Sequence, residues 1–133
     1  MRNPLVRARV DALAGAGTLD LSAPGVARGD GEDAAHGVLI RFFVRVAADD
    51  RVVDARYQVF GCATSIACAS LLAEQIPGLT LREVERIDPL SILAALSLDA
   101  DQVYAARTAV AALQGAVAAL QGAVAGAQGN LPT

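Results

Sequence analysis

The fold is decided by residues 57–74, YQVFGCATSIACASLLAE, in which a strand pattern changes into a helix pattern at Cys62. Up to the cysteine, apolar and polar side chains alternate, which is typical of a strand with one buried face. After the cysteine, Ile66, Ala69 and Leu72 recur at the spacing of a helix face. The stretch therefore predicts a strand that runs directly into a helix, with Cys62 at the junction.

A second strand is predicted immediately before this one. Apolar side chains alternate through residues 38–46, and Arg41 and Arg45 lie on the opposite face. The polar segment AADDR, residues 47–51, predicts a turn between the two strands. In the strand after the turn, we place Val53 on the apolar face. These patterns predict an antiparallel hairpin with one apolar face that other elements must cover.

Helices are predicted on both sides of the hairpin. The helix at Cys62 ends at Pro77–Gly78, because neither residue continues a helix well. Four more helix starts are marked by side chains that can accept hydrogen bonds from the free amides of a first turn. These side chains are Asn3, Thr80, Asp88 and Asp99.

Residues 18–37 are rich in Gly and acidic side chains. We expect a loop there, with at most one short strand. The predicted fold class is therefore α+β. It consists of a small antiparallel sheet, formed by the hairpin and at most a short third strand, covered by C-terminal helices.

The last helix carries an internal repeat, AVAALQG, AVAALQG, AVAGAQG, at residues 109–129. Its apolar residues from Val110 to Val124 alternate spacings of three and four, like the seam of a coiled coil. This pattern makes a homo-oligomer through the helix one expectation. We expect a single domain over residues 1–120 and a frayed tail over residues 121–133, because each Gly in a helix costs on the order of 1 kcal/mol relative to Ala.

Composition and charge argue against several classes of protein. A net charge of −3 and an isoelectric point near 5.0 offer no basic surface for a nucleic acid. Gln114, Gln121 and nearby glycines make the C-terminal helix a poor membrane span. The N-terminal segment lacks the uninterrupted apolar run of a secretory signal. We therefore expect a cytoplasmic protein without nucleic-acid or membrane partners.

The chain contains two cysteines, Cys62 and Cys68, too few for a disulfide framework. Cys62 follows Gly61 at the start of a helix, where backbone amides and the helix dipole favour the thiolate, the form that attacks sulfur or binds metal. Cys68 does not share a helix face with Cys62, and we expect it to pack in the core. Cys62 is therefore the principal candidate for chemistry.

Three motifs follow one another in the order of a known family. A hairpin ends in FGC, a helix of the form SIA…SLLAE follows, and the capped helix TLREV comes next. Over residues 37–113 this arrangement resembles the NifU/IscU-type iron–sulfur cluster assembly scaffolds. The resemblance implies an α+β scaffold rather than an enzyme. It also implies a protein that accepts sulfur from a cysteine desulfurase, binds iron, assembles a 2Fe–2S cluster and passes it to recipient apoproteins.

The resemblance also implies ligand positions, of which this sequence keeps only part. Cys62 matches the cysteine of FGC, which makes it the candidate sulfur acceptor and a candidate metal ligand. The family's CGD motif falls on His36, a second candidate metal ligand, with Val38 in place of the aspartate. The family's histidine–cysteine pair falls on Tyr104 and Ala105. We expect Tyr104 either to hydrogen-bond near the site or to pack.

Cys62 and His36 supply two of the four protein ligands that a 2Fe–2S cluster takes. Two subunits that meet at this corner would supply four. A single iron or zinc ion bound together with Asp30 or Asp33 is also open, as is the absence of any metal.

Three functions are compatible with this set of residues. The leading hypothesis is an iron–sulfur cluster assembly scaffold, divergent in its ligands. A sulfur acceptor would carry a persulfide on Cys62 and needs no metal ligands. A non-catalytic interaction or regulatory protein would keep the fold and bind a cysteine desulfurase or another partner without holding a cluster.

Overall fold

The computed structural model of the protein describes residues 3–13 and 15–129, with side chains described through Gly122. Its antiparallel sheet has the strand order β1-β2-β3, with the strands at Val26–Asp33, Val38–Val46 and Val52–Phe60. The α-helices are α1 (Pro4–Ala12), α2 (Ala63–Gln75), α3 (Leu81–Glu85), α4 (Pro89–Leu96) and α5 (Val103–Gly129). Short 3₁₀ turns, η1 (Ala34–His36) and η2 (Ala100–Gln102), precede β2 and α5.

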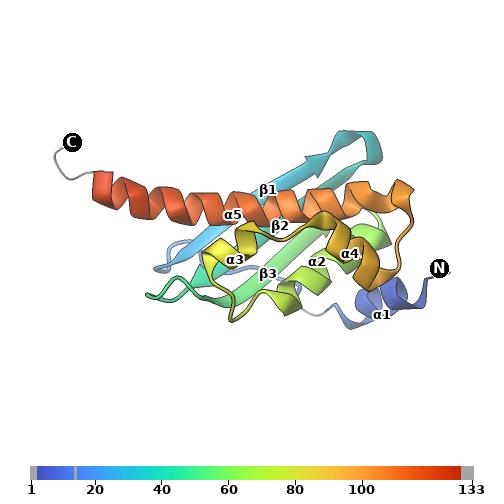
Figure 1. The fold of residues 1–133 in the computed structure, drawn as a ribbon, viewed down its shortest axis with the longest axis horizontal. Helices are drawn as coiled ribbons and strands as arrows, with labels where there is room; N and C mark the ends of the chain where they lie inside the picture. Colours follow the sequence, from blue (N-terminus) through green and yellow to red (C-terminus); the bar gives the residue numbers. More distant parts are fainter. Residues whose placement is uncertain (1–2, 14, 130–133) are drawn as a thin grey trace.

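The helices cover one face of the sheet, as Figure 1 shows. The long helix α5 lies across β1 and β2, and α2 lies along β3. The other helices pack on these two, α1 on α2, and α3 and α4 on α5. The core between the layers holds the largest fully buried side chains, among them Phe42, Ile40, Leu72, Ile76, Ile92 and Leu113. The predicted α+β class is therefore confirmed.

The third strand is longer than the sequence indicates. β1 has eight residues, paired with β2 along its whole length, where at most a short strand was expected. The positions of β1 that face α5 are Gly29 and Gly31, and both are buried. A Cβ atom on Gly29 would overlap the backbone of Ala112 and Ala116 in α5. Because glycine supplies the buried face here, the strand has none of the apolar alternation by which strands are recognised.

A β-bulge corrects the predicted orientation of Val53. The register of β2 and β3 shifts between Arg45 and Val46, so that β3 carries one extra residue near the turn. The extra residue reverses the alternation of faces at this end of β3. Val52 is therefore in the core at 2% exposure, while Val53 is 42% exposed. The assignment of Val53 to the apolar face was wrong.

The predicted helix starts are confirmed. The Asn3 side chain accepts hydrogen bonds from the amides of Leu5 and Val6. Thr80 forms a capping box with Glu83, and Asp88 caps α4. Asp99 and Gln102 form a second capping box, which opens η2 and leads into α5. Local hydrogen bonding decides where these helices begin, which is why the sequence reveals it.

The coiled-coil-like seam of α5 packs against the core of the same chain. Val110, Leu113, Val117 and Leu120 are all buried in the core, while the side chain of Val124 lies outside the described part. The helical stretch Ala100–Gly122, which includes most of α5, is long and apolar enough to cross a membrane, but 56% of its apolar segment is buried within the protein. Packing on the sheet thus accounts for the apolar character of α5.

Three predictions about α5 and the chain's organisation stay predictions. They are the homo-oligomer through α5, the single domain at residues 1–120 and the frayed tail from residue 121. The backbone of α5 is helical to Gly129, and the rest of the tail lies outside the described residues.

The contact between β1 and α5 predicts a strong effect of Gly29→Ala. The added Cβ would meet α5 backbone that cannot rotate away, so we expect a loss of at least about 3 kcal/mol in the free energy of unfolding. Urea unfolding followed by circular dichroism measures this loss.

Gly122→Ala is the matched control, because nothing lies within 4 Å of its added Cβ. It should leave stability unchanged or raise it by up to about 1 kcal/mol. Equal effects of the two substitutions would contradict this account of the contact.

Candidate functional site

Cys62 is the N-cap residue of α2, two residues after the last residue of β3. Its backbone is extended, at φ −87° and ψ 167°, so the side chain leaves the chain where the strand ends and the helix begins. The residue is partly buried and its thiol is free. The predicted junction is thus confirmed, with the cysteine one position before the first turn of the helix.

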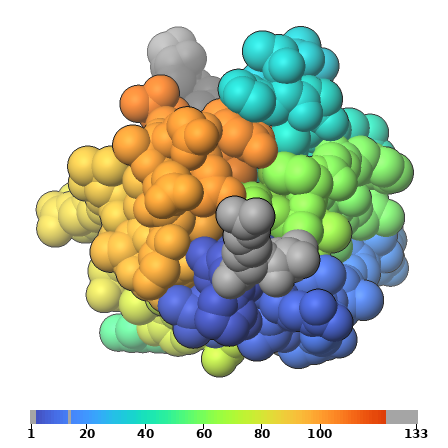
Figure 2. Space-filling model, turned by 90° about the vertical axis from the view of Figure 1, so that its right-hand side faces the viewer, coloured from blue at the N-terminus to red at the C-terminus, as the bar shows by residue number. Residues whose placement is uncertain are grey.

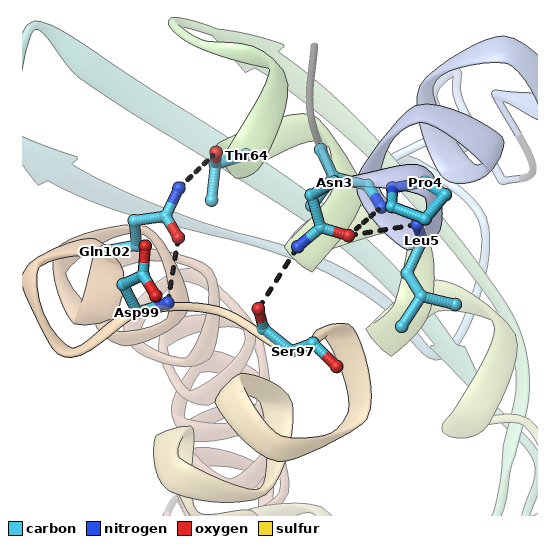
Figure 3. A pocket seen from close by; sticks show the side chains of 8 residues that line it. Asn3, Pro4, Leu5, Thr64, Ser97, Asp99 and Gln102 are labelled. Carbon is cyan, nitrogen blue, oxygen red and sulfur yellow. Dashed lines mark hydrogen bonds between the residues drawn. The ribbon is translucent and has the colours of Figure 1, made fainter.

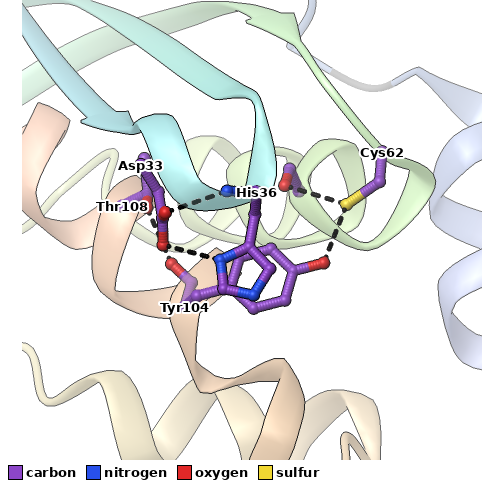
Figure 4. Close-up of polar contacts among 6 residues, drawn as sticks. Asp33, His36, Cys62, Tyr104 and Thr108 are labelled. Carbon is purple, nitrogen blue, oxygen red and sulfur yellow. Dashed lines mark hydrogen bonds and ion pairs between the residues drawn. The ribbon is translucent and has the colours of Figure 1, made fainter.

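Two hydroxyl groups contact the sulfur of Cys62. Ser65 Oγ lies 3.2 Å from Sγ, and Tyr104 Oη lies 3.3 Å from Sγ (Figure 4). Ser65 is in the first turn of α2, and Tyr104 is in the first turn of α5. The two hydroxyls therefore approach the sulfur from different helices, and the sulfur lies between them.

These contacts change the ionisation of Cys62. Partial burial, the largest single cause, raises the pKa of the thiol, but the hydrogen bonds from the hydroxyls of Ser65 and Tyr104 and from the backbone N–H groups of Ser65 and Thr64 together lower it by more. The net pKa lies below the ordinary value for cysteine. For Tyr104, the same hydrogen bond, together with burial, raises the phenol pKa to about 12. Tyr104 therefore remains protonated at neutral pH and can donate to a thiolate.

His36 belongs to the same corner of the molecule. Its ring stacks on the ring of Tyr104, with centroids 3.7 Å apart and planes 2° from parallel. His36 Nδ1 lies 3.1 Å from Oδ2 of Asp33, and the backbone N–H of His36 donates to the other carboxylate oxygen at 3.2 Å. The hydrogen bond with His36 lowers the pKa of the Asp33 carboxyl. Asp33 is the last residue of β1, so the strand end holds the histidine.

We call these five residues, Asp33, His36, Cys62, Ser65 and Tyr104, the Cys62 corner. The end of β1, η1, the start of α2 and the start of α5 meet here. Figure 2 views this face, with η1 in cyan, the start of α2 in green and the start of α5 in orange. The contacts join His36 to Cys62 through Tyr104, not directly. Tyr104 thus hydrogen-bonds at the site, which was one of its two expected roles.

The other residues weighed for metal binding do not join this corner. Asp30 forms ion pairs with Arg28 and Arg41 at 3.4 and 3.6 Å. Within residues 3–13 and 15–129, no three His, Cys, Asp or Glu side chains are arranged to hold a metal ion. Cys68 is fully buried, and its burial, with the nearby Cys62, raises the pKa of its thiol to about 12. The prediction that Cys68 packs in the core is confirmed.

A hollow of about 480 Å³ lies next to the Cys62 corner, between the starts of α1, α2 and η2 (Figure 3). Several of its polar side chains already have partners: Gln102 donates to Thr64 Oγ1 at 3.3 Å, and Asn3 donates to the carbonyl of Leu96 at 2.8 Å. Asp99 is the one charged residue among the described residues that line it. These described residues include no cysteine or histidine and form no set of metal ligands.

The family follows from sequence comparison. Residues 14–126 match the family described as "NifU-like N terminal domain". The chain belongs to this family. Its members are iron–sulfur cluster assembly scaffolds, generally non-catalytic, which bind 2Fe–2S clusters and work with cysteine desulfurases and recipient apoproteins.

Individual relatives of this NifU-like chain support the family assignment. The scaffold protein IscU of Azotobacter vinelandii is 32% identical over 98 residues, which cover 74% of this chain and 77% of that protein. The nitrogen fixation protein NifU of Nostoc is 41% identical over 63 residues, 47% of this chain and 21% of that protein. The NifU of Trichormus azollae is likewise matched over 24% of its length. This chain thus spans about a quarter or less of these NifU proteins.

Solved structures share the fold. A putative scaffold protein for the SUF system of Fervidobacterium islandicum has a TM-score of 0.64 at 17% identity, covering 85% of this chain and 93% of that one. The N-terminal part of a NifU-like protein from Brucella abortus has a TM-score of 0.63 at 21% identity, with 93% and 94% covered. These likenesses bear on the fold alone.

The structure explains how this NifU-like chain departs from the ligand set that the resemblance implies. Ala105 is fully buried and Val38 is 2% exposed, so both positions now belong to the core. Tyr104 instead touches the sulfur of Cys62. From the sequence, Tyr104 was expected either to hydrogen-bond near the site or to pack, and Ser65 was not identified. The sequence signal for Ser65 was its position three residues after Cys62, the N-cap residue of α2. The signal for Tyr104 was that it aligns with a ligand position of the family.

The hydroxyl of Ser65 predicts the behaviour of Ser65→Ala. Removing this donor should move the pKa of Cys62 to higher pH, because one hydrogen bond to the thiolate is lost. The pH dependence of iodoacetamide alkylation measures the shift. Thr64→Val is the matched control in the same helical turn, since the Thr64 hydroxyl bonds to Gln102 instead of to the sulfur. An unchanged profile in Ser65→Ala would contradict the assigned role.

Proposed function

We propose that this chain acts in iron–sulfur cluster assembly as a sulfur acceptor, with Cys62 receiving sulfur from a cysteine desulfurase. The observation that carries the proposal is the setting of Cys62. A partly exposed thiol sits at a helix N-terminus between two hydroxyl donors, in a member of a scaffold family. Such surroundings favour the thiolate, which is the attacking form in sulfur exchange.

The transfer itself needs one nucleophilic cysteine. The Cys62 thiolate attacks the terminal sulfur of the persulfide on the desulfurase. A new S–S bond forms on Cys62 while the S–S bond of the donor breaks, and the donor cysteine leaves as a thiolate. The transferred sulfur keeps its oxidation state and its proton, so the step requires no metal and no reductant.

The residues around Cys62 favour this role over holding a cluster within one chain. A 2Fe–2S cluster takes four protein ligands. At the Cys62 corner the described residues offer one thiol, one imidazole and the carboxylate of Asp33, which is three groups at most, and the imidazole is already stacked on Tyr104 and bonded to that carboxylate. Val38 and Ala105 add no ligand atoms. A cluster would need ligands from a second chain, and reconstitution tests that arrangement.

Sulfur loading is the direct test. After incubation with a cysteine desulfurase and L-cysteine, mass spectrometry should show one added sulfur atom on the peptide that contains Cys62. Cys62→Ala should gain none, and Cys68→Ala should load normally, because Cys68 is buried and its pKa is raised to about 12. A wild-type chain that gains no sulfur but still binds the desulfurase would instead support the interaction or regulatory function.

Anaerobic reconstitution with iron and sulfide provides the second test. We expect no visible charge-transfer absorption that stays with the purified chain, because the corner does not offer the four protein ligands that a 2Fe–2S cluster takes. The readouts are the absorption spectrum and the iron content after gel filtration. A chromophore that is present in the wild type and lost in Cys62→Ala would show that the chain holds a cluster, and would contradict the proposed restriction to sulfur transfer.

A further inference from the structure

Tyr104 is held at its hydroxyl, at its ring and at its backbone carbonyl. Its hydroxyl contacts Sγ of Cys62 at 3.3 Å, and its ring is covered by the parallel ring of His36. At its backbone, the carbonyl oxygen of Tyr104 accepts a hydrogen bond of 2.7 Å from Thr108, one turn further along α5. A tyrosine fixed in this way presents its hydroxyl at one position beside the sulfur, as Figure 4 shows.

His36 is held in turn by β1. Asp33 bonds both the ring and the backbone N–H of His36. Two residues before Asp33, the strand lies so close to α5 that a Cβ on Gly31 would overlap the carbonyl oxygen of Thr108. The same turn of α5 that carries Tyr104 therefore also fixes the strand that carries Asp33. The stack is set by backbone packing between a strand and a helix, and it is not a chance contact of two mobile side chains.

From this arrangement we propose that the Tyr104 hydroxyl holds the sulfur carried by Cys62 during transfer, and that His36 is a positioning residue that acts by fixing the Tyr104 ring. The inference rests on the proposed sulfur acceptance. When Cys62 carries a persulfide, its terminal sulfur lies about 2 Å beyond Sγ and accepts a hydrogen bond from a nearby donor. Tyr104 is suited to this because its hydroxyl stays protonated.

The test compares two reactions of the same thiol. One is sulfur uptake by Cys62 from glutathione persulfide, and the other is alkylation of Cys62 by iodoacetamide. Both reactions need the thiolate, so the ratio of their rates does not depend on how much of the thiol is ionised. The ratio reports how well the new terminal sulfur is held. Mass spectrometry of the Cys62 peptide follows both rates.

Tyr104→Phe keeps the ring and the stack but removes the hydroxyl. We expect it to lower the ratio by about three- to tenfold, the range that one hydrogen bond supplies. His36→Ala removes the stack and should lower the ratio in the same direction, whereas His36→Phe keeps an aromatic ring over Tyr104 and should restore it. Because His36 acts through the hydroxyl of Tyr104, adding His36→Ala to Tyr104→Phe should cause no further loss.

Tyr57→Phe is the matched control, since it removes a hydroxyl from the other tyrosine, which is buried beneath α2 and interacts with Ser70. It should leave the ratio unchanged. His36 is on the surface, so its variants fold even if Tyr104→Phe is destabilised.

Ratios at the wild-type value in both Tyr104→Phe and His36→Ala would overturn the inference and leave the proposed function intact. Additive losses in the double variant would overturn the role of His36. A wild-type Cys62 that takes up no sulfur, from glutathione persulfide or from the desulfurase, would overturn the proposed function and with it this inference.

Discussion

The close approach of β1 to α5 is the interaction on which the rest of the structure depends. Gly29 of the strand and Gly115 of the helix face one another: a Cβ atom on Gly29 would overlap the backbone of α5, and a Cβ atom on Gly115 would lie 3.3 Å from the Cα of Gly29. This contact allows a helix of 27 residues to pack closely on a three-stranded sheet. Close-packed interiors tolerate little change in volume, so the glycines fix the distance between the two layers.

That distance also determines the chemistry of the Cys62 corner. Strand β1 ends at Asp33, which bonds to His36 of η1, and helix α5 carries Tyr104, so the contact of His36 with Tyr104 depends on the packing of β1 against α5. The third partner, Cys62, comes from the junction of β3 and α2 on the neighbouring side. The sulfur is therefore contacted by the hydroxyl of Ser65 from its own helix and by the hydroxyl of Tyr104 from α5, and His36 reaches it only through Tyr104.

Membership in the NifU-like family and the altered ligand positions are consistent with one another. The fold depends on the hairpin, the glycine contact and the capped helices, and the ligand positions contribute little to any of these. Val38 and Ala105 even add to the core, where both are buried. Apolar and aromatic side chains at the ligand positions that the resemblance implies are thus compatible with the fold. The corner keeps a thiol in a setting that favours its ionised form.

The sequence by itself determined the local features: the hairpin, the helix starts at Asn3, Thr80, Asp88 and Asp99, and the junction at Cys62. Alternation, capping and turn preferences act between residues close in the chain, so they can be read from it directly. Only the tertiary structure decided the length of β1, the bulge at Val53 and the contact of Tyr104 with Cys62. The glycines of β1 are recognisable as a buried face only when α5 lies above them. Tyr104 and Cys62 are 42 residues apart, and no local rule brings them together.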